Sequence, residues 1–192
     1  MKIVPILLLL FASTLPVCGA ESRKSITYPK KLDGSGVDNL YQLGDNLYSG
    51  SKPKGEEGFQ FLAKLGVKTI LSVDGATPDV EAAKKLGIGY VHVPISTHGV
   101  TEAQARQIVK AAAEQPGPLF VHCNYGMNRG PSAAAIIGIA QHAWTAEQAV
   151  AWMKKAGTDS SCTGLFRDVR NFKAPSGTTP SRDATPLPAQ QR

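Results

Sequence analysis

A cysteine and an arginine stand six positions apart near the middle of the chain, within the segment HCNYGMNRGP at 122–131. Cys123 is a nucleophile once its thiol has lost the proton. Arg129 offers a planar fork of donors that matches two oxygens of a phosphate group. Gly126, between them, can adopt the positive φ that a tight turn demands. These residue types at this spacing predict a loop that binds a tetrahedral oxyanion and attacks it through sulfur.

The backbone around these residues can complete such a site. Apolar residues before Cys123 predict a strand, and Pro131 fits the first turn of a helix, where its missing N–H costs nothing. The loop can turn its N–H groups inward as an anion-binding nest, and the helix N-terminus adds partial positive charge. The same field favours the thiolate of Cys123. We therefore expect attack on phosphorus and a phosphocysteine intermediate.

Strand and helix patterns alternate along the rest of the core. Short loops join them, which predicts an α/β fold with a central, mainly parallel sheet flanked by helices. Ligands bind at the carboxyl ends of strands in such sheets, and three segments leave strands there: 74–75, 94–99 and 123–129. The predicted strands are 46–49, 67–73, 90–93 and 118–122, and the predicted helices are 56–65, 79–86, 101–114, 130–142, 145–156 and 165–173.

The segment from His122 to Arg129, placed between an apolar strand and a glycine-proline helix start, resembles the signature loop of the cysteine-dependent tyrosine and dual-specificity phosphatases. The segments NLYSGSKP, GVKTILSVDGA and YVHVPI resemble earlier parts of small, atypical dual-specificity domains of the bacterial type. The resemblance covers most of 40–173. It implies that Cys123 is the nucleophile, that Arg129 clamps the phosphate and that His122 orients the cysteine.

The resemblance also implies that amides of the loop bind the phosphate oxygens. Tyr125 has two open roles, one as a contact for an organic leaving group at the pocket border and one as a packing residue. The amides in question belong to Asn124, Tyr125, Gly126, Met127, Asn128 and Gly130.

The general acid departs from the family pattern. The family uses an aspartate on the loop after the strand that ends in proline, and this acid protonates the leaving oxygen. Here that loop, 94–100, reads PISTHGV and has no carboxylate. His98 is its titratable residue, and imidazole can give a proton near neutral pH. Asp74, after the preceding strand, is the other candidate. The plainer alternatives are an exposed loop histidine and a turn-forming Asp-Gly.

The residue after the arginine departs as well. Many members carry Ser or Thr there, whose hydroxyl helps the thiolate leave when the intermediate is hydrolysed, whereas this chain has Gly130. Ser132 is two positions late and is expected to point elsewhere. We therefore predict slow breakdown of the phosphoenzyme. A catalytically impaired phosphate-binding module is the second functional hypothesis. A rhodanese-like sulfurtransferase is the third, and the arginine at the helix start argues against it.

Composition limits the partners. The chain has 192 residues, 21 basic and 15 acidic, so its net charge of +6 is mild and scattered. It favours anionic ligands without indicating nucleic acid. The histidines have no metal-ligand spacing with cysteines or acids, and we expect no metal and no cofactor. A phosphorylated protein, lipid or sugar would present the same group to the loop, so the substrate stays open. We expect a monomer.

The two ends differ from the core. Residues 1–20 combine a lysine, a short apolar run and the small residues Cys18 and Ala20, which predicts a cleaved secretory signal peptide and export to the periplasm or the medium, with no stable membrane span afterwards. Lipidation of Cys18 is a weaker alternative, because bulky Val17 precedes it. Residues 21–39 are a polar lead-in, 40–173 the phosphatase-like domain, and 174–192 a proline-rich tail expected to be disordered.

Besides Cys123, the mature chain would keep one further cysteine. Cys162 lies in a polar stretch, SSCT at 160–163, where a free or partly buried thiol is the simplest expectation. In an oxidising compartment a reversible disulfide with Cys123 is an alternative, and the sequence does not determine the distance that this bond requires.

Overall fold

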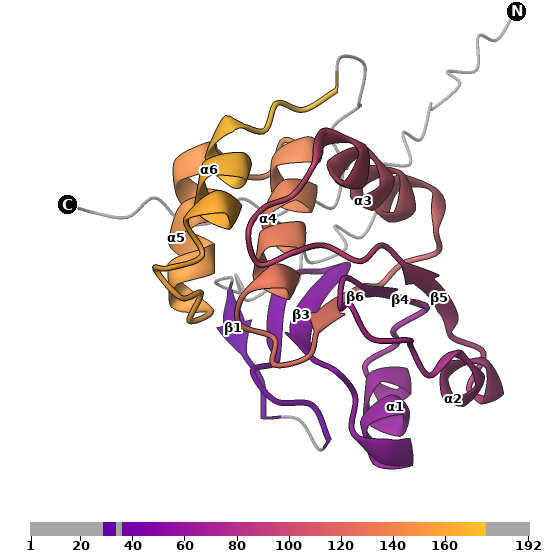
Figure 1. The fold of residues 1–192 in the computed structure, drawn as a ribbon. Helices are drawn as coiled ribbons and strands as arrows, with labels where there is room; N and C mark the ends of the chain where they lie inside the picture. The colour runs from indigo at the N-terminus through magenta and orange to yellow at the C-terminus, as the bar shows by residue number, and fades with distance from the viewer. Residues whose placement is uncertain (1–28, 34–35, 176–192) are drawn as a thin grey trace, which may run out of the picture.

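The computed structural model describes residues 29–33 and 36–175 (Figure 1). The predicted signal peptide at 1–20 and the predicted tail beyond residue 175 lie outside the described residues. Each predicted strand and helix is present, with its ends shifted by no more than two residues.

Six strands and six helices make up the described part of the chain. In chain order they are β1 (Lys30–Lys31), β2 (Tyr41–Gly44), β3 (Leu47–Ser51), α1 (Gly55–Lys64), β4 (Thr69–Ser72), α2 (Val80–Lys85), β5 (Gly89–His92), α3 (Glu102–Glu114), β6 (Leu119–Cys123), α4 (Arg129–Ala140), α5 (Ala146–Lys155) and α6 (Thr163–Asn171).

The strands form one sheet in the order β1-β2-β3-β6-β4-β5. The pairs β3–β6, β6–β4 and β4–β5 are parallel, while β1 and β2 add an antiparallel edge. The mainly parallel sheet is therefore confirmed. The antiparallel edge is not among the predicted strands, because Tyr41 and Leu43 alternate with polar residues over only four positions. With β1, the sheet extends into the segment that the sequence suggests is a polar lead-in.

Helices cover both faces of the sheet (Figure 1). The group α3 to α6 packs on one face and α1 with α2 on the other. Alternate strand residues serve the two faces, as the pleat requires. On β6, for example, Val121 joins the α3–α6 core and Phe120 joins the α1–α2 core.

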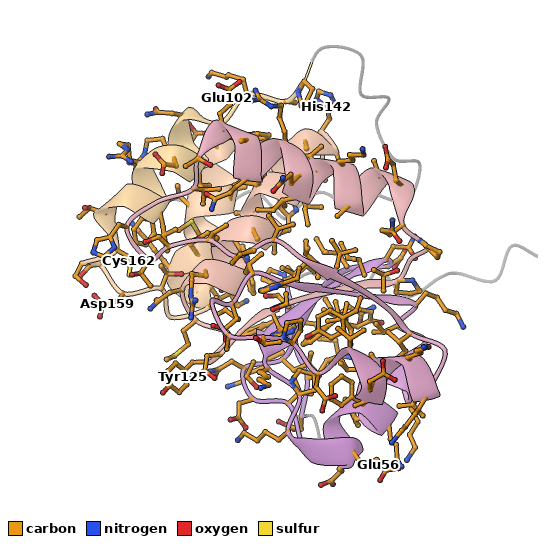
Figure 2. All side chains as sticks on the ribbon, turned by 45° about the vertical axis from the view of Figure 1, so that its right-hand side comes forward. Glu56, Glu102, Tyr125, His142, Asp159 and Cys162 are labelled. Atoms are coloured by element: carbon orange, nitrogen blue, oxygen red, sulfur yellow. The ribbon has the colours of Figure 1, made fainter. Side chains whose placement is uncertain are left out.

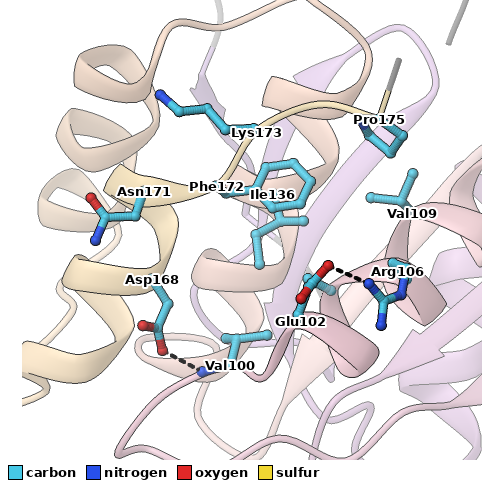
Figure 3. Close-up of a pocket in the computed structure, with 11 residues that line it drawn as sticks. Val100, Glu102, Arg106, Val109, Ile136, Asp168, Asn171, Phe172, Lys173 and Pro175 are labelled. Carbon is cyan, nitrogen blue, oxygen red and sulfur yellow. Dashed lines mark hydrogen bonds and ion pairs between the residues drawn. The ribbon is translucent and has the colours of Figure 1, made fainter. Parts of the chain in front are cut away.

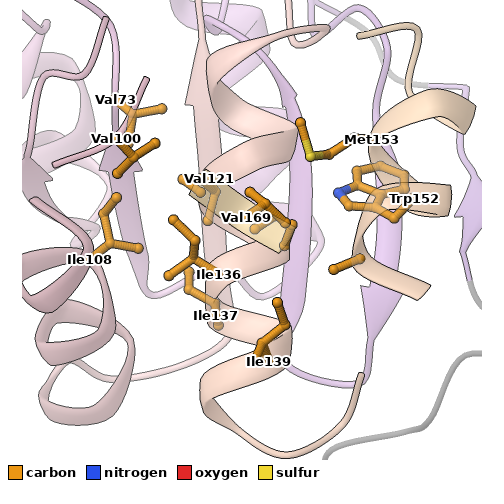
Figure 4. Close-up of a cluster of buried hydrophobic side chains, with 14 of the residues drawn as sticks. Val73, Val100, Ile108, Val121, Ile136, Ile137, Ile139, Trp152, Met153 and Val169 are labelled. Atoms are coloured by element: carbon orange, nitrogen blue, oxygen red, sulfur yellow. The ribbon is translucent and has the colours of Figure 1, made fainter. Parts of the chain in front are cut away.

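The helix α4 lies at the centre of the larger core. Every residue from Gly130 to Ala140 is buried. Figure 4 shows its isoleucines in one buried cluster that also contains Val121 of the sheet and Trp152 of α5. The Trp152 indole Nε1 donates a hydrogen bond to the Pro131 carbonyl at 3.1 Å. This bond ties α5 to the first turn of α4, directly behind the predicted phosphate loop.

The parallel strands bring the predicted site segments to one edge. On β6, Cys123 pairs with Ser51 of β3, and His122 pairs with Ser72 of β4. The segments that follow β3, β4, β5 and β6 therefore emerge side by side, as expected for an α/β sheet. No helix in the described ranges is long and apolar enough to cross a membrane.

Candidate active site

The predicted phosphate loop joins β6 to α4. Cys123 ends the strand and is only 3% exposed, and Arg129 begins the helix. Gly126 has a φ of +71°, and a Cβ on it would clash with the backbone of Gly50 and Ser51. Only glycine fits this turn, because the loop passes directly over the end of β3.

The main chain holds both ends of the loop. The Asn124 carbonyl accepts from the Lys52 N–H at 3.2 Å, and the Asn128 carbonyl accepts from the Ser132 N–H at 3.2 Å as the first bond of α4. The first N–H groups of a helix have no partner within it, and the first turn of α4 lies beside Cys123, since a Cβ on Gly130 would be 3.6 Å from Sγ. A negatively charged group placed there would meet the positive end of the α4 dipole.

The structure brings two of the predicted residues into contact. An Asp74 carboxylate oxygen, Oδ1, lies 3.1 Å from Nη1 of Arg129, and both side chains are largely buried. The Asp74 carbonyl accepts from Nε2 of His92 at 2.8 Å, which links the end of β5 to the segment after β4. Asp74 therefore does more than form a turn, because it is the charge partner of the arginine predicted to clamp phosphate.

His122 is buried at the end of β6 and 1% exposed. Burial lowers its pKa to about 4, so the ring is neutral near pH 7. Burial raises the pKa of Tyr90, whose hydroxyl lies 2.7 Å from Nε2 of His122. A protonated phenol donating to Nε2 leaves Nδ1 as the N–H that faces the Cys123 carbonyl at 3.4 Å. His122 therefore supports the backbone of the cysteine, consistent with the orienting role that the family resemblance implies.

The loop at 94–100, the other candidate source of a proton, is anchored to α6. The Val100 N–H donates to Oδ2 of Asp168 at 2.8 Å (Figure 3), and the His98 carbonyl packs so closely on Gly164 that a Cβ there would overlap it. The His98 ring is exposed, and its Nδ1 lies 3.0 Å from Oγ of Ser96. No contact in the described part of the chain joins His98 to Cys123.

Gly130 and Ser132 occupy the positions expected from the sequence. A Cβ on Gly130 would lie 3.6 Å from Sγ of Cys123, so a serine there would place its side chain beside the thiol. Ser132 is buried, and its hydroxyl donates to the Asn128 carbonyl at 2.9 Å. The prediction that Ser132 points elsewhere is confirmed, and the thiol has no hydroxyl beside it from either residue.

Two exposed side chains of the loop are large and hydrophobic. Tyr125 is 67% exposed and Met127 is 37% exposed, the former at the molecular surface in Figure 2. Tyr125 is therefore available to a ligand and is not a packing residue. Gly157, in the segment between α5 and α6, faces Met127. Tyr125 and Met127 both belong to the loop that begins at Cys123.

Cys162 is free and buried at the start of α6, and Cys123 is also free. Burial, with a contribution from Asp159, raises the pKa of the Cys162 thiol. The structure contains no disulfide between the two cysteines. Within residues 29–33 and 36–175, no group of three histidines, cysteines or acids is placed to hold a metal ion.

A separate pocket of about 440 Å³ lies between α3 and α6 (Figure 3). None of the phosphate-loop residues lines it. Val100, Val109 and Phe172 give it an apolar wall, with Arg106 and Asp168 at its edge. It adjoins the 94–100 loop and is not the site that the sequence predicts.

Three residues that support the site carry no recognisable motif. Tyr90 contacts His122, Asn39 contacts the Tyr125 carbonyl, and Thr158 contacts the Met127 carbonyl. They come from three segments far apart in the chain. Asn39 lies just before the buried Leu40, and Thr158 follows a glycine at a helix end, but neither signal would have assigned them to the loop.

Comparison with known proteins supports the family. No family model matches the chain. The dual specificity protein phosphatase TpbA of Pseudomonas aeruginosa is 28% identical over 121 residues, which are 62% of this chain and 55% of that protein. The chain therefore spans about half the length of the curated relatives it matches.

Solved structures share the fold. TpbA of P. aeruginosa in complex with pTyr has a TM-score of 0.64 and 24% identity, covering 78% of this chain and 92% of that one. The catalytic core of the PP-IP phosphatase SIW14 from S. cerevisiae, in complex with citrate, has a TM-score of 0.57 and 19% identity, covering 70% and 87%. The sequence relationship to TpbA, with the shared fold, indicates a superfamily like that of the cysteine-dependent tyrosine and dual-specificity phosphatases, which the loop from Cys123 to Arg129 resembles.

Proposed function

We propose that the protein is a cysteine-dependent phosphatase that hydrolyses phosphomonoesters. The observation that carries the proposal is the buried Cys123 at the base of a loop that ends in Arg129, itself held by Asp74 at 3.1 Å. A nucleophile below an anion-binding nest, with a bidentate donor at its rim, suits attack on phosphorus.

The reaction has two steps. The Cys123 thiolate attacks phosphorus, an S–P bond forms, and the bond from phosphorus to the leaving oxygen breaks. Arg129 and the loop amides take up the charge on the phosphoryl oxygens. Water then attacks the phosphocysteine and gives a proton to the group that protonated the leaving oxygen, the S–P bond breaks, and inorganic phosphate leaves with the thiolate restored.

The leaving oxygen needs a proton in the first step. Asp74 and His98 are the candidates, and they differ in position. Asp74 contacts the arginine that would clamp the phosphoryl group, while the His98 ring contacts Ser96 of its own loop. The contact with Arg129 favours Asp74 as the group next to the substrate, and a matched pair of variants separates the two roles.

Two exposed side chains of the loop favour one class of substrate. Tyr125 and Met127 present exposed apolar surface beside the loop, which suits the aromatic ring of an aryl phosphate. The related TpbA was crystallised with pTyr. We propose that phosphotyrosine-type esters are accepted. Phosphorylated proteins, lipids and sugars remain the physiological candidates, because each presents the same phosphoryl group.

Turnover of p-nitrophenyl phosphate and phosphotyrosine tests the proposal. Wild-type protein should release phosphate, and Cys123→Ser should lose at least about 10⁴-fold in kcat, because the hydroxyl is a poor nucleophile without a neighbouring base. Cys162→Ser is the matched control, since it changes the other buried cysteine and should retain turnover. Equal activity of wild type and Cys123→Ser would reject the mechanism.

A phosphate-binding module without turnover is the second candidate. It is favoured by Gly130, which leaves no hydroxyl beside the thiol, and by the lack of a carboxylate in residues 94–100. Wild type that binds inorganic phosphate or vanadate in calorimetry, with no phosphate release from either ester, would establish this alternative.

We also propose that the protein is exported. The pattern of residues 1–20 supports this location, and cleavage after Ala20 would remove the apolar run. Expression of the full chain in a bacterium, followed by fractionation and N-terminal sequencing, tests it. A cytoplasmic product that begins at Met1 would reject export.

A further inference from the structure

We propose that Asn39 and Thr158 are positioning residues that hold the phosphate loop in its anion-binding form before the ligand arrives. The inference rests on the proposed function, since it concerns the loop that would bind the phosphoryl group. Both residues lie outside that loop, on separate segments, and neither is expected to touch the substrate.

Thr158 reaches the loop from the connection between α5 and α6. Its hydroxyl Oγ1 donates to the Met127 carbonyl at 2.7 Å, and the residue is 8% exposed. The neighbouring Asp159 N–H donates to Oδ1 of Asn128 at 3.0 Å. Two successive residues of this connection therefore bind two successive residues of the phosphate loop.

Asn39 reaches the loop from the segment just before β2. Its side-chain Nδ2 donates to the Tyr125 carbonyl at 2.9 Å. Its φ is +48°, in the left-handed region that asparagine tolerates better than most residues. The backbone at residue 39 is thus shaped to present the amide to the loop.

These bonds decide which way the loop amides face. In a trans peptide, the carbonyl of one residue and the N–H of the next point in opposite directions. The carbonyls of residues 124, 125, 127 and 128 all accept hydrogen bonds from groups outside the loop. The N–H groups that follow them are therefore turned inward, above Cys123. They belong to Tyr125, Gly126, Asn128 and Arg129.

The two main-chain bonds, from Lys52 and Ser132, would survive almost any substitution. The bonds to the middle of the loop come from side chains, Asn39 and Thr158. Without them, the peptides after Tyr125 and Met127 could rotate toward solvent. Anion binding would then have to order the loop. The apparent affinity would equal the intrinsic affinity multiplied by the fraction of molecules whose loop is already correctly oriented.

Thr158→Val removes the donor with almost no change of shape. We expect the Kd for inorganic phosphate, measured by calorimetry, to rise about fivefold, the cost of one hydrogen bond of about 1 kcal/mol. Backbone ¹⁵N relaxation should show new motion at Asn128 in the ligand-free protein. Thr158→Ser keeps the hydroxyl and should restore both values.

Thr69→Val is the matched control. Thr69 makes the same kind of bond, from Oγ1 to the Pro116 carbonyl at 2.8 Å, and it lies at the opposite end of the parallel strands. It should lower the unfolding free energy by an amount similar to Thr158→Val while leaving phosphate affinity unchanged. A purely structural role for Thr158 would make the two variants alike in affinity.

Asn39→Gly tests the second tether. Glycine accepts the positive φ and removes the donor, so the backbone should remain in place. Asn39→Asp retains the size of the side chain but offers no N–H donor. We expect each to weaken phosphate binding about fivefold, with new motion at Gly126, and the Asn39→Gly, Thr158→Val double variant to weaken it further.

Failure of the positioning role and failure of the proposed function would give different results. Unchanged phosphate affinity and unchanged relaxation in both variants would overturn the positioning role, whatever the catalytic result. A wild type that neither binds phosphate nor turns over esters would reject the proposed function. In that case the relaxation data still decide whether the two side chains hold the loop.

Discussion

Two loops at the same sheet edge are held in opposite ways. In the phosphate loop, Cys123 to Arg129, carbonyls are bound from outside by Lys52, Asn39, Thr158 and Ser132. In the loop at 94–100, α6 anchors the backbone, but the side chains of Ser96 and His98 are exposed and bond to each other. In the first loop the bound carbonyls point away from Cys123, and in the second the polar side chains of Ser96 and His98 point into solvent.

The difference reflects what each part would do. Backbone amides bind an oxyanion well only when they are oriented beforehand, because reorganisation during the reaction costs the stabilisation they provide. A proton donor needs only a titratable group within reach. The phosphate loop therefore has to be held in place by its surroundings. The candidate proton donors, Asp74 and His98, have to be distinguished by substitution.

The strongest test of the ordered loop is Arg129→Lys. Lysine keeps the charge but loses the planar fork, so we expect kcat/KM for p-nitrophenyl phosphate to fall by about 10³-fold. Arg106→Lys, at an exposed pair with Glu102, is the control and should leave kcat/KM unchanged. A loss of less than about tenfold at Arg129 would show that the fork is not needed and that the loop amides suffice.

The buried His122, next to the phosphate loop, predicts that the free energy of unfolding depends on pH. His122 titrates near 6.5 when unfolded and at about 4 when folded, so the unfolded state binds more protons between these values. Stability contributed by the neutral ring is complete above pH 6.5 and is lost as the pH falls toward 4, by up to about 3 kcal/mol. Urea unfolding of wild type and His122→Asn between pH 4 and 7 measures the difference.

The exposed His98 provides the control for that experiment. His98→Gln should keep the steep loss of stability seen in wild type, whereas His122→Asn should have a shallower one. Identical pH profiles for wild type and His122→Asn would contradict a neutral, buried His122 ring.

Asp74→Asn tests a residue that contacts the phosphate loop and is also a candidate proton donor. It removes the charge partner of Arg129 and a candidate acid, and we expect kcat/KM to fall by about 10²-fold. If Asp74 gives the proton, the loss should be greater for phosphoserine than for p-nitrophenyl phosphate, whose leaving group needs less help. An equal loss for the two esters would assign Asp74 to the alignment of Arg129 alone.

His98→Gln is expected to have a smaller effect. Its ring is exposed and bonds to Ser96, so we predict less than about a tenfold loss of kcat/KM. The pH–rate profile is the sharper readout. If the fall in activity at high pH disappears in His98→Gln and persists in Asp74→Asn, then His98, on the loop at 94–100, supplies the proton.

Gly130→Ser should have the smallest effect. The new side chain would start 3.6 Å from Sγ of Cys123, and one hydrogen bond to the leaving thiolate should speed phosphoenzyme breakdown about fivefold. A smaller pre-steady-state burst of p-nitrophenol would report it. Gly130→Ala adds the same Cβ without the hydroxyl, so an equal change in that variant would attribute the effect to packing.

Much of the fold follows from local sequence. Apolar β-branched runs such as 67–73 and capping boxes at Thr101 and Thr145 act within a few residues, and the structure places these elements where they were predicted. The antiparallel edge was missed because β1 and β2 are short and become strands by pairing, β2 with β3 and β1 with β2, and these are contacts between segments and not a local pattern.

For the site, the sequence by itself predicted Cys123 as the nucleophile, Arg129 as the phosphate clamp and the glycine turn between them, since their spacing within one loop is a local property. It named Asp74 and His98 as acids without ranking them. Only the tertiary structure placed Asp74 against Arg129, left His98 in solvent, and brought Asn39, Tyr90 and Thr158 to the phosphate loop. Their hydrogen bonds join segments far apart in the chain, and such distances are set by packing, which no local spacing encodes.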